Sequence, residues 1–271
     1  MSTKILFTDL DGTLLNSDKN ISEGNLKAIC DMTSQGHKFV IATGRPITSA
    51  IQIAEKYGWT GEGYYISSYN GGLIYDCHSN KSIVEHSMPL KYVRYILDEA
   101  YKAGIHAHTY DDKNVVSEHE TQELLNYTRT IMVPPIVVDD ACKYLTREPI
   151  KVITISRGSH EVLDPFRQKI IDYAGDEITT VFSHSELLEF AHPMATKGRA
   201  LEYMCKHFDI PIKNSVAAGD EENDLSMITA AGTGVAMCNA TEAVKAAADY
   251  ITCNDNNHDG IAEIINRFIL N

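Results

Sequence analysis

The chain has 271 residues, which exceeds the usual size of one domain, so we expect two domains or one domain with a large insertion. Its formal net charge of −13 at pH 7 argues against nucleic acid as a partner, because a phosphate backbone requires clustered Lys and Arg. The six cysteines contain no C-x-x-C pair and no apolar run approaches the roughly 18 residues of a membrane span, so we expect a reduced, cytoplasmic protein that does not enter a membrane.

The first predicted strand, over residues 5–7, is followed by two carboxylates. Asp9 and Asp11 are separated by one residue, and Gly12 then lets the backbone turn sharply. A buried strand of an open α/β sheet presents such residues at its carboxyl end, in the crevice where ligands bind. Two carboxylates so close together repel each other unless a cation lies between them or one keeps its proton. The pattern therefore indicates phosphoryl chemistry, with an ordinary Asp-Gly turn as the alternative.

The stretch up to about residue 76 alternates predicted helices and strands. Ser22 is a typical N-cap and Gly36 a typical end for a first helix, and a strand follows over residues 39–42. Residues 43–46 interrupt the pattern, and a second helix then continues to Gly58. This alternation is typical of a parallel sheet that is covered by helices.

The middle of the chain, residues 83–189, has a different pattern. Predicted helices over residues 92–101 and 162–173 stand beside short paired strands, the first pair lying at residues 106–110 and 114–116. Helices next to antiparallel hairpins favour an α+β module. We therefore expect this part of the chain to form an insertion into the parallel-sheet unit.

The last third, residues 190–271, resumes the first pattern. Predicted strands over residues 216–218 and 234–237 alternate with helices over residues 224–231 and 241–248. Repeated strand-helix units with apolar strands imply a parallel sheet with helices on both faces. The two ends of the chain are therefore expected to build one α/β unit.

Three further segments place polar residues at strand ends or helix starts. The hydroxyl of Thr43 is placed to donate to a phosphoryl oxygen, with an ordinary turn before a helix as the alternative. Lys197 precedes a helix whose N-terminus favours anions, although a solvated lysine fits the same pattern. Asp220 follows a strand and is placed to ligate a metal together with Asp9, unless it only caps the helix that follows.

The order of these motifs resembles that of the haloacid dehalogenase superfamily. Asp-x-Asp-Gly-Thr, a Thr after a strand, a Lys, and Gly-Asp-x-x-Asn-Asp follow one another over the whole chain. Residues 43–46, residues 70–72 and Gly260 are similar to those of the Cof-type phosphatases, which carry a large C2-type cap. The resemblance implies a Rossmann-like core formed by residues 1–82 and 190–271, with residues 83–189 as an α+β cap domain.

The resemblance also implies a Mg²⁺-dependent phosphatase that hydrolyses small phosphorylated metabolites, with sugar phosphates as the expected class. Asp9 would attack phosphorus and form an aspartyl-phosphate. Asp11 would be the general acid and then the general base, which requires a pKa well above its reference value of about 3.9. The carboxylates of Asp9 and Asp220 and the backbone carbonyl of Asp11 would hold Mg²⁺, while Asp224 would orient bound water.

The same resemblance assigns the phosphoryl-binding groups. Thr43 and Lys197 would bind the transferring phosphoryl group and are counted among the catalytic residues. Gly44 would leave backbone amides accessible, and Arg45 and Asn223 would assist. The small phosphorylated substrate is the only partner expected, and the enzyme would be a monomer or a homodimer.

Some features depart from this pattern or leave it open. Residues 192–196 before Lys197 differ from the Gly-Val-Ser-like approach that is more common in the family, so the geometry of that loop is not predicted. His106, His108 and Tyr110 are candidates to line the cap, although such alternating strands are more often half exposed. Two other functions remain open, a phosphomutase of related fold and a non-catalytic metal-binding or phospho-sensing regulator.

Overall fold

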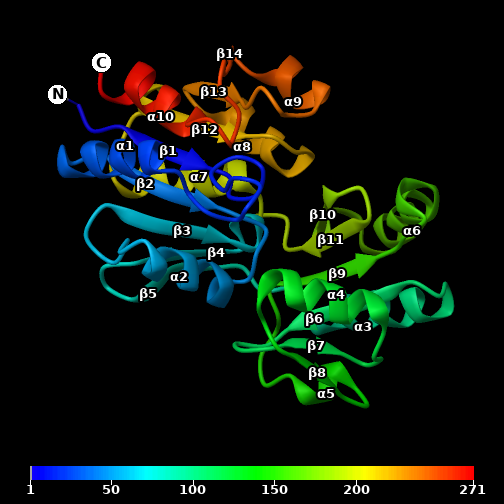
Figure 1. Ribbon diagram of the computed structural model, residues 1–271. Coiled ribbons are helices and arrows are strands. Elements are labelled where there is room, and N and C mark those ends of the chain that lie inside the picture. Colours follow the sequence, from blue (N-terminus) through cyan, green and yellow to red (C-terminus); the bar gives the residue numbers. More distant parts are fainter. Residues whose placement is uncertain (1) are drawn as a thin grey trace.

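The computed structural model describes residues 2–271, and within them the strands form two sheets (Figure 1). The larger sheet has eight strands in the order β14-β13-β12-β1-β2-β3-β4-β5. They are β1 (Ile5–Thr8), β2 (Lys38–Ala42), β3 (Tyr64–Ser68), β4 (Leu73–Asp76), β5 (Lys81–Glu85), β12 (Ser215–Gly219), β13 (Thr233–Ala236) and β14 (Tyr250–Ile251). Because β1 lies between β2 and β12, both ends of the chain build this sheet.

The central strand is buried on both sides. All four residues of β1 are buried, and its neighbours β2 and β12 run parallel to it. Successive side chains of a strand point to opposite faces, so Leu6 packs in one hydrophobic cluster while Ile5 and Phe7 pack in another. At the far edge β3, β4 and β5 pair antiparallel, which extends an otherwise parallel sheet.

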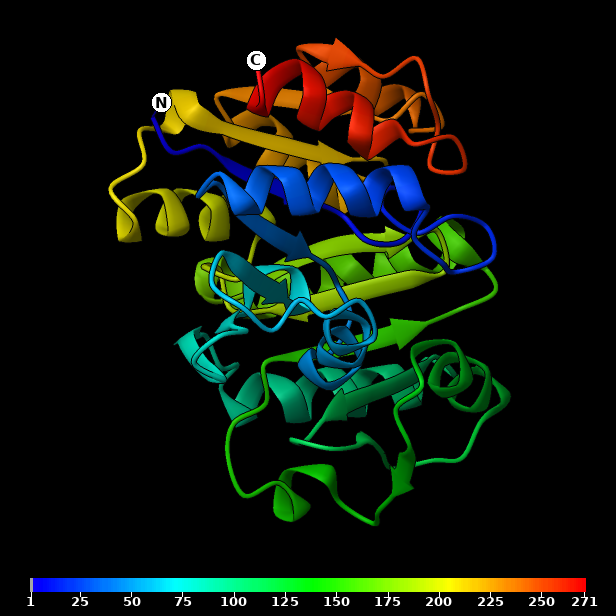
Figure 2. The same ribbon diagram turned by 60° about the vertical axis from the view of Figure 1, so that its left-hand side comes forward.

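Helices cover both faces of the larger sheet. They are α1 (Glu23–Ser34), α2 (Ile47–Lys56), α7 (Lys197–His207), α8 (Leu225–Ala230), α9 (Glu242–Ala247) and α10 (Gly260–Ile264). Figure 2 shows α1 lying across the sheet beside the C-terminal helix, and α1 and α10 are in contact. Ile29 of α1 shares a cluster with Leu6, whereas Leu201 of α7 joins Phe7 on the other face. Short 3₁₀ or π turns occupy Tyr69–Gly71, Gly175–Glu177, Ile212–Asn214, Glu222–Asp224 and Ile265–Ile269.

The smaller sheet has six strands in the order β10-β11-β9-β6-β7-β8. They are β6 (His106–Tyr110), β7 (Val115–Ser117), β8 (Pro135–Val137), β9 (Lys151–Ile155), β10 (Thr179–His184) and β11 (Leu187–Ala191). The helices of this unit are α3 (Leu90–Lys102), α4 (Gln122–Ile131), α5 (Ala141–Tyr144) and α6 (Ser159–Ala174). Ile96 of α3 and Phe166 of α6 pack with Val152 and Phe190 on one face, while Leu124 of α4 belongs to a cluster that also contains Tyr69 of the larger unit.

The predicted fold class is confirmed: an α/β core with a mainly parallel sheet receives an inserted α+β unit. The expected boundaries of the inserted unit, after residues 82 and 189, both fall inside strands. β5 stays paired with β4 as far as Glu85, and β11 stays paired with β9 as far as Ala191. We therefore propose that the inserted unit, called the cap below, comprises residues 86–191 and that the rest is the core.

The two connections between core and cap meet. The chain enters the cap at His86 and leaves it at His192, and the two imidazole rings are stacked with centroids 5.2 Å apart and planes 14° from parallel. Burial lowers the pKa of His86, and His192 lowers it further. This stacking holds both crossings at one place.

Among the helices of residues 2–271, none combines the length and the apolar composition that crossing a membrane requires.

Candidate active site

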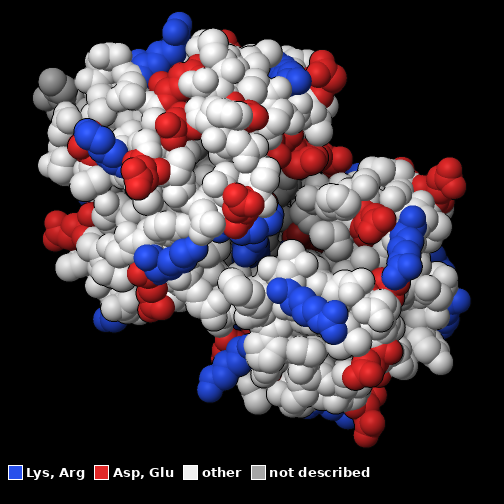
Figure 3. All heavy atoms as spheres, in the orientation of Figure 1, with Lys and Arg blue, Asp and Glu red and all other residues white. Residues whose placement is uncertain are grey.

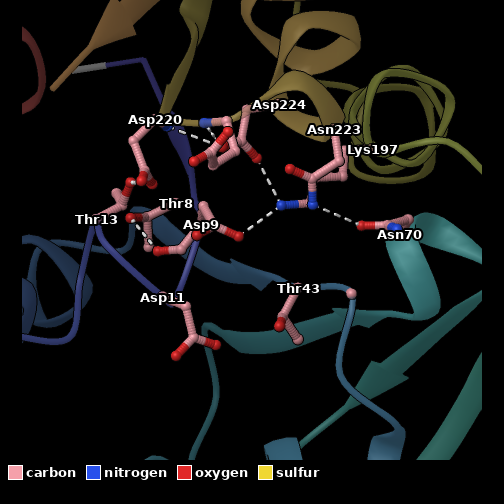
Figure 4. A network of polar contacts seen from close by, with 12 residues as sticks. Thr8, Asp9, Asp11, Thr13, Thr43, Asn70, Lys197, Asp220, Asn223 and Asp224 are labelled. Atoms are coloured by element: carbon pink, nitrogen blue, oxygen red, sulfur yellow. Dashed lines mark hydrogen bonds and ion pairs between the residues drawn. The ribbon is translucent and has the colours of Figure 1, made fainter. Parts of the chain in front are cut away.

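The polar residues of the site follow the carboxyl ends of neighbouring parallel strands in the middle of the larger sheet (Figure 4). Asp9 comes directly after β1, Thr43 after β2 and Asp220 after β12. Backbone hydrogen bonds continue beyond the strand ends: the amide of Asp9 donates to the carbonyl of Ala218 at 2.9 Å, and the amide of Thr43 donates to that of Ser67 at 2.8 Å. The ends of the strands therefore hold these side chains in fixed positions.

Three buried carboxylates form the centre of the site. Asp9, Asp220 and Asp224 each place one oxygen within 4.8 Å of the others. Burial raises the pKa of Asp9 well above its ordinary value, and it raises the pKa of Asp220 to about 7, with neighbouring acids adding to both shifts. A cation bound among these carboxylates would favour their charged forms and lower both pKa values. Carboxylate oxygens are the ligands that Mg²⁺ prefers, so the donor set fits that ion.

Asp224 has both oxygens occupied by donors of the chain. Its Oδ2 accepts hydrogen bonds from the backbone amides of Asp220, at 2.8 Å, and Glu221, at 3.1 Å. Its Oδ1 accepts one from Nζ of Lys197 at 2.5 Å. The hydroxyl of Thr13 donates to Oδ1 of Asp220 at 2.6 Å. These contacts orient the carboxylates of the cluster without adding a second cation.

Lys197 is the cation inside the cluster. Its Nζ bridges Asp9 and Asp224, with a distance of 2.5 Å to one oxygen of each. Burial favours the neutral amine, but the two carboxylates outweigh it and hold the pKa of Lys197 above its ordinary value. The hydroxyl of Thr196 accepts from the amide of Arg199 and caps helix α7, which begins at Lys197. The lysine is therefore charged and points into the site from the start of a helix.

Asp11 lies apart from this cluster. Figure 4 shows its carboxylate turned away from Asp220 and Asp224. Arg45 holds it in a two-point contact, with Nε 2.7 Å from Oδ2 and Nη2 2.8 Å from Oδ1, and Lys19 approaches to 2.9 Å. Although burial acts to raise the pKa of Asp11, these two cations lower it below its ordinary value. The raised pKa predicted for Asp11 is therefore absent in this structure.

The loop after β2 and the turn after β3 are joined to the acid cluster. Thr43 accepts a hydrogen bond from the amide of Arg45 at 3.1 Å, and its carbonyl accepts one from the amide of Asn70 at 2.9 Å. Asn223 donates from Nδ2 to Oδ1 of Asn70 at 3.0 Å, as Figure 4 shows. Gly71, with φ +98°, must be glycine because a Cβ there would lie 2.4 Å from the carbonyl oxygen of Thr196. The turn is thereby packed directly against the approach to Lys197.

A cavity of about 390 Å³ opens between core and cap next to these residues. Figure 3 shows this face hollowed where the two units meet, with atoms of Lys or Arg side chains at the hollow. The core lines it with residues predicted from the sequence, Asp9, Asp11, Thr43, Gly44, Arg45 and Asn223, and with two that were not, Lys19 and Glu221. The cap contributes side chains that the sequence did not single out, among them Glu123, Asn126, Tyr127, Arg157, Glu186 and Glu189.

The three cap candidates of the sequence lie elsewhere. His106, His108 and Tyr110 are buried on one side of β6 and are neither half exposed nor part of the cavity lining. Nε2 of His106 is 2.9 Å from Nδ1 of His108, whose Nε2 is 3.3 Å from the hydroxyl of Tyr110. That hydroxyl is 2.5 Å from the hydroxyl of Tyr127, which does line the cavity. The row therefore supports a cavity residue from behind, which the alternation alone could not indicate.

A buried ion pair connects the cap to the core beside the cavity. Lys151 of β9 donates from Nζ to the carbonyl of Gly44 at 2.6 Å and to Oε2 of Glu189 at 2.7 Å. Nδ2 of Asn70 donates to the same Oε2 at 2.9 Å. Burial lowers the pKa of Lys151, and Glu189 opposes that shift. The contacts hold the cap strand β11 against the loop that carries Thr43.

Known proteins are similar to this chain in sequence and in fold. A model of the haloacid dehalogenase-like hydrolase family matches residues 6–265. A putative phosphatase from Streptococcus pyogenes is 31% identical over 276 residues and the match covers 100% of both chains, and a pyridoxal phosphate phosphatase from Escherichia coli is 29% identical with 98% of each covered. A haloacid dehalogenase-like hydrolase from Bacteroides thetaiotaomicron has a crystal structure that superposes with a TM-score of 0.87, at 31% identity and with 98% and 99% of the two chains covered.

Proposed function

The chain belongs to the haloacid dehalogenase-like hydrolase family and is a phosphatase, and from this premise we propose a mechanism. We propose that the protein uses Mg²⁺ to hydrolyse small phosphate monoesters and that Asp9 becomes phosphorylated during the reaction. One observation carries the proposal. Three buried carboxylates converge within 4.8 Å at the strand ends, and a charged lysine joins two of them. A site of this kind attracts a divalent cation and an anionic phosphoryl group together.

The proposed metal site uses Asp9, Asp220 and the backbone carbonyl of Asp11. Both oxygens of Asp224 already accept hydrogen bonds from the chain, which supports a role in orienting bound water rather than in direct ligation. Bound there, Mg²⁺ would offset the negative charge of the transferring phosphoryl group. Thr13 keeps Asp220 in place through its hydroxyl.

The proposed reaction has two steps. An oxygen of Asp9 forms a bond to phosphorus as the bond from phosphorus to the ester oxygen breaks, and Asp11 gives its proton to the leaving oxygen. Water then attacks phosphorus, Asp11 takes the proton that the water loses, and the bond between Asp9 and phosphorus breaks to release phosphate. Asp9 and Asp11 end in their starting states.

Acid catalysis by Asp11 requires a change from the arrangement described above, because Arg45 and Lys19 stabilise its charged form. A bound phosphate ester is a second anion beside the same two cations. It would draw Arg45 away from Asp11 and would raise the pKa of Asp11 by repulsion. Substrate binding would thus convert Asp11 from an ion-pair partner into a proton donor.

The phosphoryl group is proposed to bind between the loop after β2 and the start of α7. Thr43 would donate its hydroxyl, Gly44 its accessible backbone, and Lys197 its ammonium group, while Arg45 and Asn223 lie at the same cavity wall. The location of Lys197 at the first residue of helix α7 adds the favourable helix terminus.

The proposal is tested by measuring phosphate release over a panel of esters that includes sugar phosphates and pyridoxal phosphate. Wild-type protein should release phosphate with Mg²⁺, without any bisphosphate activator, and should lose activity in excess EDTA. Asp9→Asn should abolish turnover while the circular dichroism spectrum stays that of the wild type. Full activity in EDTA, or turnover by Asp9→Asn, would contradict the mechanism.

We also propose a cytoplasmic location and a monomeric or homodimeric state.

A further inference from the structure

The cap contributes to the cavity one buried carboxylate that is only half used. Glu189 is 4% exposed and lines the cavity. Its Oε2 accepts hydrogen bonds from Lys151 and Asn70, at 2.7 and 2.9 Å. No donor within residues 2–271 reaches its Oε1. Within residues 2–271 only Nδ2 of Asn25 and Oγ of Ser67 are fully buried without a partner, so Oε1 of Glu189 keeps accessible surface and can accept from a donor that a ligand brings into the cavity.

The free oxygen lies next to the phosphoryl-binding loop. A Cβ built on Gly44, the residue after Thr43, would be 3.3 Å from Oε1 of Glu189. The absence of a side chain at Gly44 thus leaves the carboxylate in contact with the loop. A ligand group that reaches Oε1 must therefore lie close to the phosphate ester rather than at the far end of the molecule.

A carboxylate close to an anionic phosphoryl group would ordinarily repel it. Here Lys151 neutralises Glu189, because its Nζ is 2.7 Å from Oε2 and both side chains are almost fully buried. The pair carries no net charge, so Lys151 offsets the repulsion that Glu189 would otherwise exert on the phosphoryl group. Lys151 and Asn70 act as positioning residues that fix the direction of the free oxygen.

We propose that Glu189 determines specificity by accepting a hydrogen bond through Oε1 from a hydroxyl or ammonium group on the carbon next to the ester carbon of the substrate. This inference rests on the proposed phosphatase function and names the class of ester that it prefers. A ligand that covers Oε1 without offering a donor would leave this acceptor without water or any other partner, so the site would discriminate against such a ligand.

Three esters with chains of equal length test the assignment: 2-hydroxyethyl phosphate, 2-aminoethyl phosphate and n-propyl phosphate. The wild-type enzyme should show a kcat/KM for at least one donor-bearing ester about 10- to 100-fold above that for n-propyl phosphate, the range expected for a hydrogen bond to a charged group. The better of the two donor-bearing esters shows whether the substrate group is a hydroxyl or an ammonium.

Glu189→Gln is the informative variant. The amide oxygen of Gln can keep the hydrogen bonds from Lys151 and Asn70, which places its NH₂ where Oε1 was and replaces the acceptor with a donor. The preference for donor-bearing esters should then disappear. Glu186→Gln is the matched control, because it removes the same charge from another acid of the same cavity wall and should keep the preference.

Two results would overturn the assignment. One is equal kcat/KM for all three esters in the wild-type enzyme, which requires no variant to fold. The other is a preference that survives in Glu189→Gln or that falls equally in Glu186→Gln. Phosphate release from p-nitrophenyl phosphate distinguishes a failure of the proposed phosphatase function from a failure of the role proposed for Glu189. Its absence under all conditions would refute the proposed function itself, whereas its presence with equal alkyl-ester rates refutes only the role of Glu189.

Discussion

Lys197 and Asp224 form an ion pair of 2.5 Å whose two side chains are completely buried. A pair of this kind repays the loss of hydration only when further hydrogen bonds satisfy both partners, as the two backbone amides do for Asp224. Asp9 and Asp220 lie beside it with raised pKa values, because burial disfavours their charged forms. A divalent cation that binds these acids would stabilise the charged forms, and this leads to the first prediction.

Mg²⁺ should stabilise the wild-type protein by binding only the folded state. At a concentration about 100 times its dissociation constant, the thermal midpoint should rise by about 5–10 °C. Asp220→Asn should lose most of this rise because it removes a proposed ligand. Asp11→Asn is the control that should keep it, since the backbone carbonyl of residue 11 is unchanged. Differential scanning fluorimetry measures the shift, and an equal rise in the wild type and in Asp220→Asn would argue against the site.

The loss of activity in Asp11→Asn should depend on the leaving group. An alkyl ester needs a proton on its leaving oxygen, so its kcat should fall by about 10²- to 10⁴-fold. p-Nitrophenyl phosphate has a leaving group that departs as an anion, and its first step should be affected much less. Single-turnover measurements of that step make the comparison. Equal losses for the two esters would show that Asp11 is not the acid.

Lys151→Met should destabilise the protein strongly because Glu189 would keep a buried charge without a partner. Breaking one side of a buried pair typically costs about 3–5 kcal/mol. The double variant Lys151→Met, Glu189→Leu should recover much of that loss, since neither charge remains. Unfolding in urea for the wild type, both single variants and the double variant gives the coupling free energy. Additive effects would mean that the pair contributes no interaction of its own.

The row of buried histidines in the cap should make stability depend on pH. Burial lowers the pKa of His106 to about 4, outweighing the opposing charge of Glu123. The folded state therefore holds His106 neutral. The contribution of this neutral side chain to the free energy of unfolding is complete above the unfolded pKa of about 6.5 and is lost as the pH falls towards 4, because the unfolded chain then binds a proton that the folded chain does not. The full shift corresponds to about 3 kcal/mol.

His106→Gln removes this titration and serves as the test. The difference in thermal midpoint between pH 7 and pH 4.5 should be smaller in the variant than in the wild type. A surface variant, His78→Gln, is the control and should leave the pH dependence unchanged, because His78 is exposed. If the thermal midpoint depends on pH in the same way in the wild type and in His106→Gln, another group causes any loss of stability at low pH.

The sequence located the core part of the site because its residues follow strands that are recognisable locally. Asp9, Thr43 and Asp220 each come at the end of a short apolar run, and parallel strands bring their carboxyl ends together. The geometry then confirms that they share one edge of the sheet. Their chemical roles remain predictions, since nothing in the fold alone distinguishes an attacking carboxylate from a ligand.

The remainder depends on contacts between distant parts of the chain. Asn70 and Glu189 are 119 residues apart, and the low pKa of Asp11 depends on Arg45, 34 residues away. Local patterns carry no signal for such pairs. Helix α4, which supplies Tyr127 to the cavity, escaped detection although Thr121 caps it through its side chain. A threonine alone does not predict a helix, because its hydroxyl stabilises turns as well as helix N-termini.

The stacked rings of His86 and His192 mark the place where the chain passes twice between the two units. Two adjacent crossings resist torsion about the long axis of the molecule, because such a twist would wind one strand of chain around the other. Rocking about the line that joins the crossings strains neither of them. Rocking of this kind would carry Glu189 of the cap away from Gly44 of the core, and it would break the hydrogen bonds from Lys151 to Gly44 and from Asn70 to Glu189. A single angle then sets how far the free carboxylate oxygen stands from the phosphoryl-binding loop.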